Sequence, residues 1–352
     1  MRAEAVGTLS SELFALGTSD LLGELLEKLT EPEAYASLTP MQRRSVEECK
    51  KDYDRAKKIP PDLHREYVVL AAKSEAVWEE AKPAGDFDAF RPYLEKIIDM
   101  KIQIADLWGY GADRYDALLD VYEPGITVEK LDAVFAALRA KLVPLAERIA
   151  AAPQPDVSFL GRNVPVDKQR AFGEFILREI GYDFAAGRLD ASAHPFATGL
   201  NPGDVRVTTR YKEDDAGFSL FATIHEGGHA LYEQNISAEL AGTNLCEGTS
   251  MGIHESQSRL WENMIGRSLP FWERYYDDFR RITGEFGDVE LERFYRAVNE
   301  VKPSLIRTEA DELTYNLHIM VRYELEKDLI NRRLRVADLP EAWNAKYKEY
   351  LG

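Results

Sequence analysis

The residues of this sequence best suited to chemistry are two histidines four positions apart, with a glutamate directly after the first. Residues 223–233 read Thr-Ile-His-Glu-Gly-Gly-His-Ala-Leu-Tyr-Glu, which places His225, Glu226 and His229 together. On a helix, side chains four positions apart lie on one face, with Cβ atoms about 5–6 Å apart. Two imidazoles at this spacing can share one Zn²⁺ ion at about 2.0–2.1 Å each. Glu226 can then take a proton from an attacking water, as peptide hydrolysis requires.

Two glycines interrupt the predicted helix between the histidines. Gly227 and Gly228 are adjacent, and each glycine in a helix interior costs about 1 kcal/mol relative to alanine. A helix that contains two of them has a packing or functional reason to do so. We therefore expect either another backbone or a substrate to approach the helix closely at this point.

The third metal ligand has to come from another segment. A third histidine at the set position after the motif is excluded, because Tyr232 and Asn235 stand where that pattern needs glycine and histidine. The alternative is a carboxylate from a second helix, and residues 252–263 read as that helix. Glu255 is the first candidate, 26 positions after His229. The other candidates, which spacing does not exclude, are His254, Glu247 and Glu262.

The elements that must hold these residues are mostly helices. Leucines recur near helical spacing between residues 9 and 29, and residues 128–150 carry apolar side chains along one face. Thr127 is a suitable N-cap for the second of these helices. Residues 166–180 form a further predicted helix that ends at Gly181.

One segment breaks the helical pattern just before the histidine motif. Residues 204–211 are β-branched and alternate in polarity, which predicts a strand. Residues 214–217 then offer a turn and the start of the motif helix. Because a strand needs a partner, we expect a small sheet beside the histidines, with residues 157–164 as a candidate partner strand.

Length, charge and cysteine content narrow the class of protein. The 352 residues can form one large helical domain, and we predict a single, mostly helical domain over residues 1–352. A net charge of −17 argues against nucleic acid and membrane partners. With only Cys49 and Cys246, and no apolar stretch typical of a leader or a membrane span, we expect a cytoplasmic protein.

Five segments of the sequence resemble the motifs of a known family. The runs HEGGHALYEQ (225–234) and HESQSRLWEN (254–263) resemble the carboxypeptidase Taq family of metallocarboxypeptidases. Three further segments resemble its other motifs and stand in the same order, namely HPF (194–196), DVRVT (204–208) and IRTEAD (306–311). The resemblance extends over essentially the whole chain.

The resemblance implies a role for each matching residue. It implies that His225, His229 and Glu255 are the metal ligands, that Glu226 is the general base, and that Arg307 binds the terminal carboxylate of the substrate. It also implies a homodimer of mainly α, gluzincin-like subunits, each a helical bundle with a deep groove and a small β-sheet beside the metal. Members of the family remove residues singly from peptide C-termini, using Zn²⁺ or Co²⁺.

This sequence also differs from the pattern of the family, and the differences leave other functions possible. Family members extend beyond this sequence at both ends, and the C-terminal extension carries a further motif, GxxQDxHW. We therefore expect a chain shortened at both termini. The alternatives to a carboxypeptidase are a gluzincin oligopeptidase or dipeptidyl-carboxypeptidase, which would share the metal ligands, and an inactive metal-binding remnant.

Four further residues are weaker site candidates. His194 and Arg206 lie in motif segments, His194 in a loop near the predicted strand and Arg206 on it. The resemblance makes both candidates for substrate binding, although a lone histidine more often has a structural role and Arg206 can simply be part of the sheet. Tyr315 and His318 lie three positions apart on the helix predicted after Asp311. Either could donate a hydrogen bond to a transition-state oxyanion, or simply pack in the core.

Overall fold

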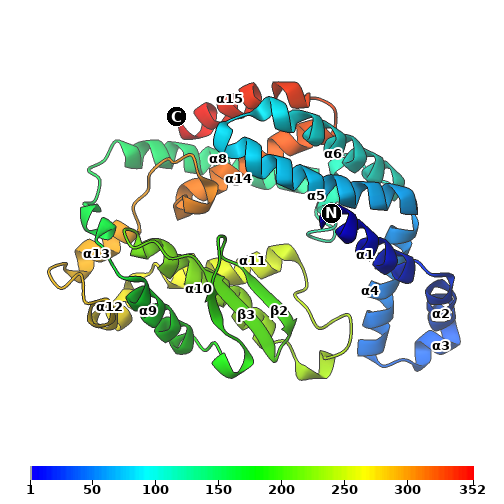
Figure 1. Cartoon of the computed structure of the whole chain (residues 1–352), viewed down its shortest axis with the longest axis horizontal. Coiled ribbons are helices and arrows are strands. Elements are labelled where there is room, and N and C mark those ends of the chain that lie inside the picture. The colour runs from blue at the N-terminus through cyan, green and yellow to red at the C-terminus, as the bar shows by residue number, and fades with distance from the viewer. Residues whose placement is uncertain (1) are drawn as a thin grey trace. The chain divides into compact units, whose positions relative to one another are not determined.

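The computed structural model describes residues 2–352, which fold mainly into helices with one small sheet, as the sequence predicts (Figure 1). The chain divides into two compact units. The first unit consists of the residues up to Phe135 together with Met320–Glu349. The second unit consists of Ala136–Ile319 and Tyr350–Gly352. The expectations of a single domain over residues 1–352 and of a deep groove remain predictions. Within residues 2–352, no helix is long and apolar enough to cross a membrane.

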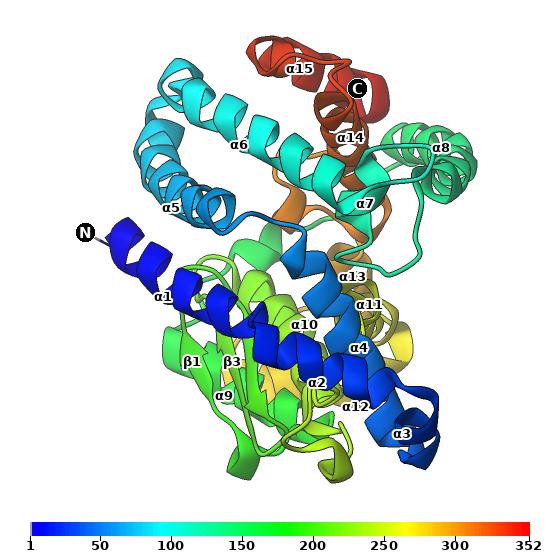
Figure 2. The ribbon, with the colours of Figure 1, turned by 90° about the vertical axis from the view of Figure 1, so that its right-hand side faces the viewer.

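The first unit consists entirely of helices. Its helices are α1 (Arg2–Gly17), α2 (Asp20–Thr30), α3 (Pro32–Ser37), α4 (Pro40–Lys57), α5 (Pro61–Ala84), α6 (Phe87–Trp108), α7 (Tyr115–Leu119), α8 (Val128–Ala150), α14 (Glu312–Ile330), the 3₁₀ helix η6 (Val336–Asp338) and α15 (Leu339–Leu351). The boundaries between the two units fall within α8, α14 and α15. Helix α5 packs against both α1 and α6 (Figure 2). Tyr53 of α4 lies against Gly23 of α2, where an added Cβ atom would collide with the tyrosine hydroxyl.

The predicted leucine-rich segment and the Thr127 helix both form, but most of the leucines between residues 9 and 29 do not face a core, although Leu26 of α2 is buried. Leu9, Leu13 and Leu16 of α1 are more than two-thirds exposed. Helix α8 begins at the predicted point, where the Thr127 Oγ1 accepts a hydrogen bond from the Lys130 backbone (3.3 Å). Periodicity therefore identifies these helices but does not say which of their faces is covered.

The second unit contains the sheet and the histidine motif. Its remaining elements are the 3₁₀ helix η1 (Ser158–Gly161), α9 (Val166–Glu179), the 3₁₀ helix η2 (Phe184–Ala186), β1 (Leu189–Ala191), β2 (Ala197–Asn201), β3 (Asp204–Thr209), α10 (Ala216–Gln234), the 3₁₀ helix η3 (Ala238–Leu240), α11 (Met251–Arg259), the π-helix η4 (Leu260–Ile265), α12 (Leu269–Thr283), α13 (Leu291–Val298) and the 3₁₀ helix η5 (Arg307–Glu309). Gly181, which follows α9, has the positive φ expected of a helix-terminating glycine.

The predicted strand is the central strand of a three-stranded sheet with the order β1-β3-β2. Strand β1 pairs with β3 in parallel, and β2 pairs with β3 antiparallel. The prediction of residues 157–164 as the partner strand is wrong, because that segment forms η1. Asp156 accepts a hydrogen bond from the Ser158 backbone (2.9 Å), which starts a turn, and Phe159 is buried in the core instead of lying along a strand.

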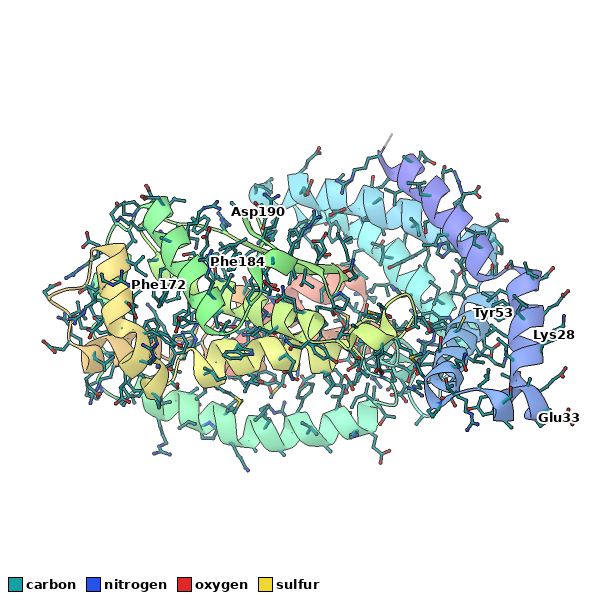
Figure 3. The ribbon with its side chains drawn as sticks, turned by 90° about the horizontal axis from the view of Figure 1, so that it is seen from below. Lys28, Glu33, Tyr53, Phe172, Phe184 and Asp190 are labelled. Atoms are coloured by element: carbon teal, nitrogen blue, oxygen red, sulfur yellow. The ribbon has the colours of Figure 1, made fainter. Side chains whose placement is uncertain are left out.

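Helix α10 is the element on which the second unit is built. It packs against β2 and β3 on one side and against α9, α11 and η4 elsewhere (Figures 1 and 2). Its N-terminus is the predicted one, with the Asp215 side chain accepting a hydrogen bond from the Phe218 backbone (3.1 Å). An aromatic core lies beside it and includes Phe172 of α9, which is labelled in Figure 3. The ring of Phe172 meets that of Phe279 of α12 edge to face at 4.9 Å. The motif residues are thus fixed to a rigid, buried helix.

Candidate metal centre

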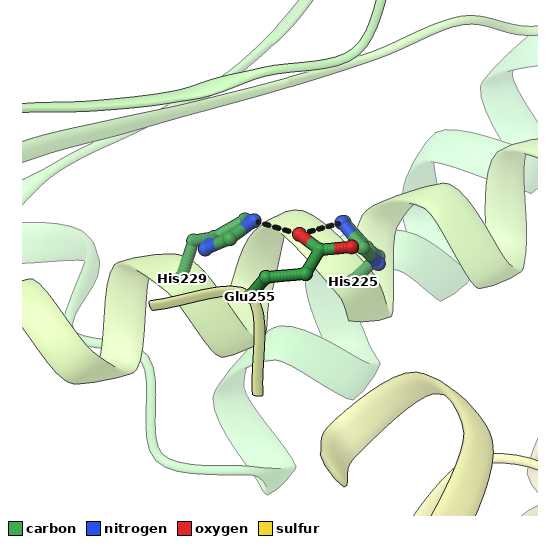
Figure 4. Close-up of side chains that lie close together, drawn as sticks. All are labelled: His225, His229 and Glu255. Atoms are coloured by element: carbon green, nitrogen blue, oxygen red, sulfur yellow. Dashed lines mark ion pairs between the residues drawn. The ribbon is translucent and has the colours of Figure 1, made fainter. Parts of the chain in front are cut away.

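Three side chains from two helices converge on one point of the second unit. His225 and His229 lie one turn apart on α10, and Glu255 reaches them from α11 (Figure 4). The Glu255 Oε2 lies 3.5 Å from the Nε2 of His225 and 3.3 Å from the Nε2 of His229. In a tetrahedral site with ligand distances of about 2.0–2.1 Å, neighbouring ligand atoms lie about 3.3–3.4 Å apart. The Glu255 oxygen therefore lies at about this spacing from both imidazoles, and the three groups are of the donor types that bind a zinc-like ion.

The possible ligand atoms of His225, His229 and Glu255 all lie within 4.8 Å of one another. Among residues 2–352, these residues form the one such group of three or more His, Cys, Asp or Glu side chains. Of the other candidates for third ligand, Glu247 is exposed. His254 and Glu262 are close, but they contact the Nδ1 atoms of the two motif histidines, on the side of each ring away from Glu255.

Gly228 explains how α11 comes so near. A Cβ atom at this position would lie 2.7 Å from the Ser258 Cα and 2.8 Å from the Gln257 carbonyl oxygen, both in the backbone of α11. A Cβ at Gly227 would instead meet the tip of Leu177 at 2.6 Å. The expectation that something approaches the helix closely at the paired glycines is confirmed, and the approaching group is another backbone.

Glu255 is held by a second contact on its other oxygen. The Arg259 Nε donates to its Oε1 (2.9 Å), while the Nη1 of the same guanidinium donates to the Glu262 Oε2 (3.1 Å). Burial raises the pKa of Glu255, but hydrogen bonds from His225 and His229 outweigh it and leave the pKa well below its usual range. An ionised carboxylate is the form that ligates a metal.

Glu262 supports His225 from the outer side. Its Oε2 lies 2.8 Å from the His225 Nδ1, and it stands in the π-helix η4, a form of helix that often occurs at functional sites. Burial raises the pKa of Glu262, but the hydrogen bond to His225 and the charges of Arg259 and Arg267 outweigh it and lower the pKa overall. A carboxylate on the outer nitrogen fixes the orientation of a ligating imidazole.

Glu226, the predicted general base, is buried next to the two histidines. Burial raises its pKa, which the charges of His225 and His229 and hydrogen bonding to the Ala197 backbone only partly offset. Ala197 is the first residue of β2, so the predicted small sheet does lie beside the histidines. A raised pKa brings a carboxylate nearer to the range in which a general base works at neutral pH.

Arg307 lies in η5 and is half-buried. Its Nη1 donates to the Tyr315 Oη (2.7 Å), and the ring of Tyr315 stacks on the Arg259 guanidinium at 3.9 Å. The acidic neighbours of Arg307 are engaged elsewhere, since Glu309 pairs with Lys212 and Asp311 caps the N-terminus of α14. Within residues 2–352, no carboxylate lies at ion-pair distance from Arg307.

The other candidate residues, His194, Arg206 and His318, have no contact with the three proposed metal ligands among the contacts described above. His194 is exposed in the loop between β1 and β2. Arg206 is exposed on the face of the sheet opposite to the buried Val205 and Val207, and it pairs with Asp204 (2.8 Å). His318 is 0% exposed, so it offers a ligand no accessible surface in this conformation.

Two residues of this region are missing from the sequence-based candidates. Arg259 follows Glu255 by four positions, and Glu233 follows His229 by four, so helical spacing alone could have placed each beside a ligand. Each contacts a residue of the site in the structure, Arg259 through Glu255 and Glu233 through His254. The contact of Arg259 with Glu255 lies within α11, whereas the contact of Glu233 with His254 depends on the packing of α10 against α11.

Comparisons with known proteins identify the family of this chain. The model of the family described as carboxypeptidase Taq (M32) metallopeptidase matches residues 1–352. Carboxypeptidase 1 of Bacillus subtilis is 50% identical over 353 residues, covering 100% of this chain and 70% of the relative. Thermostable carboxypeptidase 1 of Thermus thermophilus is 44% identical over 362 residues, covering 100% and 71%. The solved structure of the M32 carboxypeptidase from Deinococcus radiodurans has a TM-score of 0.94 at 45% identity, covering 100% of this chain and 70% of that chain.

The match to the family model extends over the full length of the chain. A family of metallopeptidases implies a divalent metal, and the two imidazoles and one carboxylate gathered here suit such an ion. The chain therefore belongs to the carboxypeptidase Taq family, and it is a metal-dependent carboxypeptidase, a peptide hydrolase.

Proposed function

We propose that His225, His229 and Glu255 bind one divalent cation, and that this ion is Zn²⁺, with Co²⁺ as a functional substitute. The observation that carries the proposal is the spacing of the three ligand atoms, with the Glu255 Oε2 at 3.3 and 3.5 Å from the two imidazole nitrogens. Two imidazoles and one carboxylate leave a fourth position for water or substrate, which is the arrangement of catalytic zinc sites.

We assign the proton transfers to Glu226. The bound ion would polarise the scissile carbonyl and acidify a water molecule. Glu226 takes the proton from that water as it attacks and later delivers it to the departing amine. Its position directly after His225 and the raised pKa of its buried carboxyl group support this role. For a further donor to the oxyanion we favour Tyr315 over His318, because the Tyr315 hydroxyl accepts from Arg307 and can donate its own hydrogen.

Arg307 is proposed to recognise the free C-terminus of the peptide. A terminal carboxylate is the group that distinguishes a chain end from an internal bond, and leaving it buried without a partner costs several kcal/mol. A guanidinium can bind it with two parallel charge-assisted hydrogen bonds, each contributing about 1.5–3 kcal/mol. Arg307 suits this role because its present partner is a neutral hydroxyl, and the acidic side chains near it in sequence are engaged elsewhere.

The test compares one peptide as its free acid and as its C-terminal amide, with the parent protein and with Arg307→Ala. The substitution should lower kcat/KM for the acid by about 30- to 1,000-fold, equivalent to about 2–4 kcal/mol. Amidation should cause a similar loss with the parent, and the two losses should not add, because both remove the same interaction. Arg281→Ala, which removes an exposed arginine paired with Asp278, is the matched control.

The products separate this proposal from its alternatives. Single residues released in succession support a carboxypeptidase that measures from the chain end. Dipeptides or larger fragments, or equal cleavage of acid and amide by the parent, would contradict the role of Arg307 and favour an oligopeptidase. Bound metal without any release of product would identify an inactive metal-binding protein.

We also propose, from the family resemblance, that the protein acts on peptides in the cytoplasm as a homodimer. His194 and Arg206 are proposed to contact the peptide, since both side chains are exposed, His194 in the loop between β1 and β2 and Arg206 on β3. Sedimentation at micromolar concentration tests the dimer, and a single monomer boundary would contradict it. Alanine substitutions at the two positions should raise KM more than they lower kcat.

A further inference from the structure

The outer nitrogen of His229 is occupied by a second histidine. The Nδ1 of His229 lies 2.6 Å from the Nδ1 of His254, and the Nε2 of His254 lies 2.7 Å from the Glu233 Oε1. The three side chains therefore form a continuous chain of hydrogen bonds that begins at the centre and ends at a carboxylate. All three are largely buried, with side-chain exposures of 17%, 26% and 14% in that order.

The positions of the hydrogens in this chain follow from the metal ligand. An imidazole that offers its Nε2 to a cation carries its hydrogen on Nδ1. His229 must then donate through Nδ1, so the Nδ1 of His254 must be the acceptor. His254 in turn carries its hydrogen on Nε2 and donates it to Glu233. Each nitrogen is thus either a donor or an acceptor, and both hydrogen bonds are donated in the direction from His229 through His254 to Glu233.

The surrounding chain fixes the ring of His254 in this position. Tyr232 meets it edge to face at 5.1 Å. A Cβ atom at Gly248 would lie 2.5 Å from the His254 Cδ2, so the glycine backbone lies directly against the imidazole. Glu233 lies close to β2, where an added Cβ atom at Gly199 would be 3.0 Å from its Oε2. The ring has little room to turn, as a positioning group requires.

We propose that His254 is a positioning residue, not a metal ligand, and that with Glu233 it fixes the tautomer and orientation of His229. The proposal rests on the proposed metal role of His225, His229 and Glu255. It assigns different supports to the two ligating histidines. His225 is held by the carboxylate of Glu262, whereas His229 is held by a neutral imidazole that is itself anchored by a carboxylate.

The decisive variant is His254→Phe, which keeps a ring of similar shape but removes both nitrogens. Its affinity for Zn²⁺, measured by competition with a chromogenic chelator, should fall about 10- to 100-fold, as is typical when a group supporting a ligand is lost. The visible absorption of the Co²⁺-loaded protein should change as well, because the geometry at His229 changes. His254→Asn, whose amide oxygen stands near the position of Nδ1, should recover part of the affinity.

Two further variants complete the test. Gly248→Ala displaces the His254 ring without removing any functional group. It should therefore lower the affinity for Zn²⁺, as His254→Phe does. Tyr232→Phe removes a hydroxyl that bonds only to Thr249 among residues 2–352, and it should leave affinity and spectrum unchanged. Thermal unfolding of the metal-free proteins shows whether each variant folds. If His254→Phe does not fold, Gly248→Ala decides the question.

The outcomes separate this proposal from the one on which it rests. Parent-like affinity and spectrum in both His254→Phe and Gly248→Ala would overturn the positioning role. A loss in His254→Phe as complete as that in Glu255→Ala would also overturn it, because His254 would then be a ligand. If Glu255→Ala itself binds metal like the parent, the metal site assigned above is wrong, whatever the His254 variants show.

Discussion

Replacing Gly228 by alanine tests whether the approach of two backbones sets the metal site. The added methyl would lie 2.7 Å from the Ser258 Cα, whereas ordinary contact begins at 3.4 Å. The backbone of α11 must therefore retreat by about 0.7 Å, the difference of these two distances. Ser258 lies one turn after Glu255 and its Oγ donates to the Glu255 carbonyl (2.8 Å), so the carboxylate moves with it.

The size of the effect follows from how little a metal site tolerates. Ligand distances in functional sites vary by about 0.2 Å, well below the displacement expected here. We predict that the affinity for Zn²⁺ falls about 10- to 100-fold, or about 1.4–2.7 kcal/mol. Global stability should change less, because overpacking costs about 1–3 kcal/mol while alanine returns about 1 kcal/mol of helix propensity.

Gly227→Ala is the matched control, since it adds the same methyl group one position earlier on the same helix. Its Cβ would meet the side-chain tips of Leu177 and Ile180, which can rotate aside, and it does not face α11. It should therefore lower the unfolding midpoint slightly and leave metal affinity unchanged. Chelator competition and thermal unfolding, each with and without metal, measure both quantities.

Two results would refute this reasoning. Parent-like affinity in Gly228→Ala would show that α11 can retreat without moving Glu255. Equal losses of affinity in Gly227→Ala and Gly228→Ala would show that the effect comes from the flexibility of α10, and not from its distance to the neighbouring helix.

Two further substitutions separate binding from chemistry. Glu226→Gln should keep parent-like metal content while kcat falls by about 10²–10⁴-fold, and turnover near the parent value would exclude Glu226 as the base. Glu262→Gln should weaken Zn²⁺ binding about 10- to 100-fold, because the amide supports His225 without a charge. Elemental analysis and chelator competition measure these effects, and unchanged affinity in Glu262→Gln would contradict its supporting role.

The parts of the fold that could be predicted from the sequence are those governed by local spacing. Helices α8 and α9, strand β3 and the motif helix α10 all form where periodicity and capping residues indicate them. The partners of β3 were not predictable in this way. Strands β1 and β2 are only three and five residues long and lack an alternating apolar pattern, so only the tertiary packing reveals them.

The candidate site shows the same division. The spacing of His225 and His229 indicated a metal, but spacing alone did not choose between Glu255 and His254 as third ligand. These neighbours in sequence point to opposite sides of His229, one toward its Nε2 and one toward its Nδ1. Adjacent residues of a helix point about 100° apart, so the choice between them depends on how α11 is rotated against α10.

That rotation and register are in turn fixed by a single close contact. Gly228 of α10 lies against Ser258 of α11, and from this point the residue numbers rise along one helix as they fall along the other. His225 accordingly meets Glu262, and Glu233 meets His254. The antiparallel packing at this register brings His225 to Glu262 and Glu233 to His254. The same packing brings Glu255 to the two histidines of the motif. The glycine that appears costly in a helix interior therefore specifies which acidic side chain reaches the metal position and which ones support the histidines from behind.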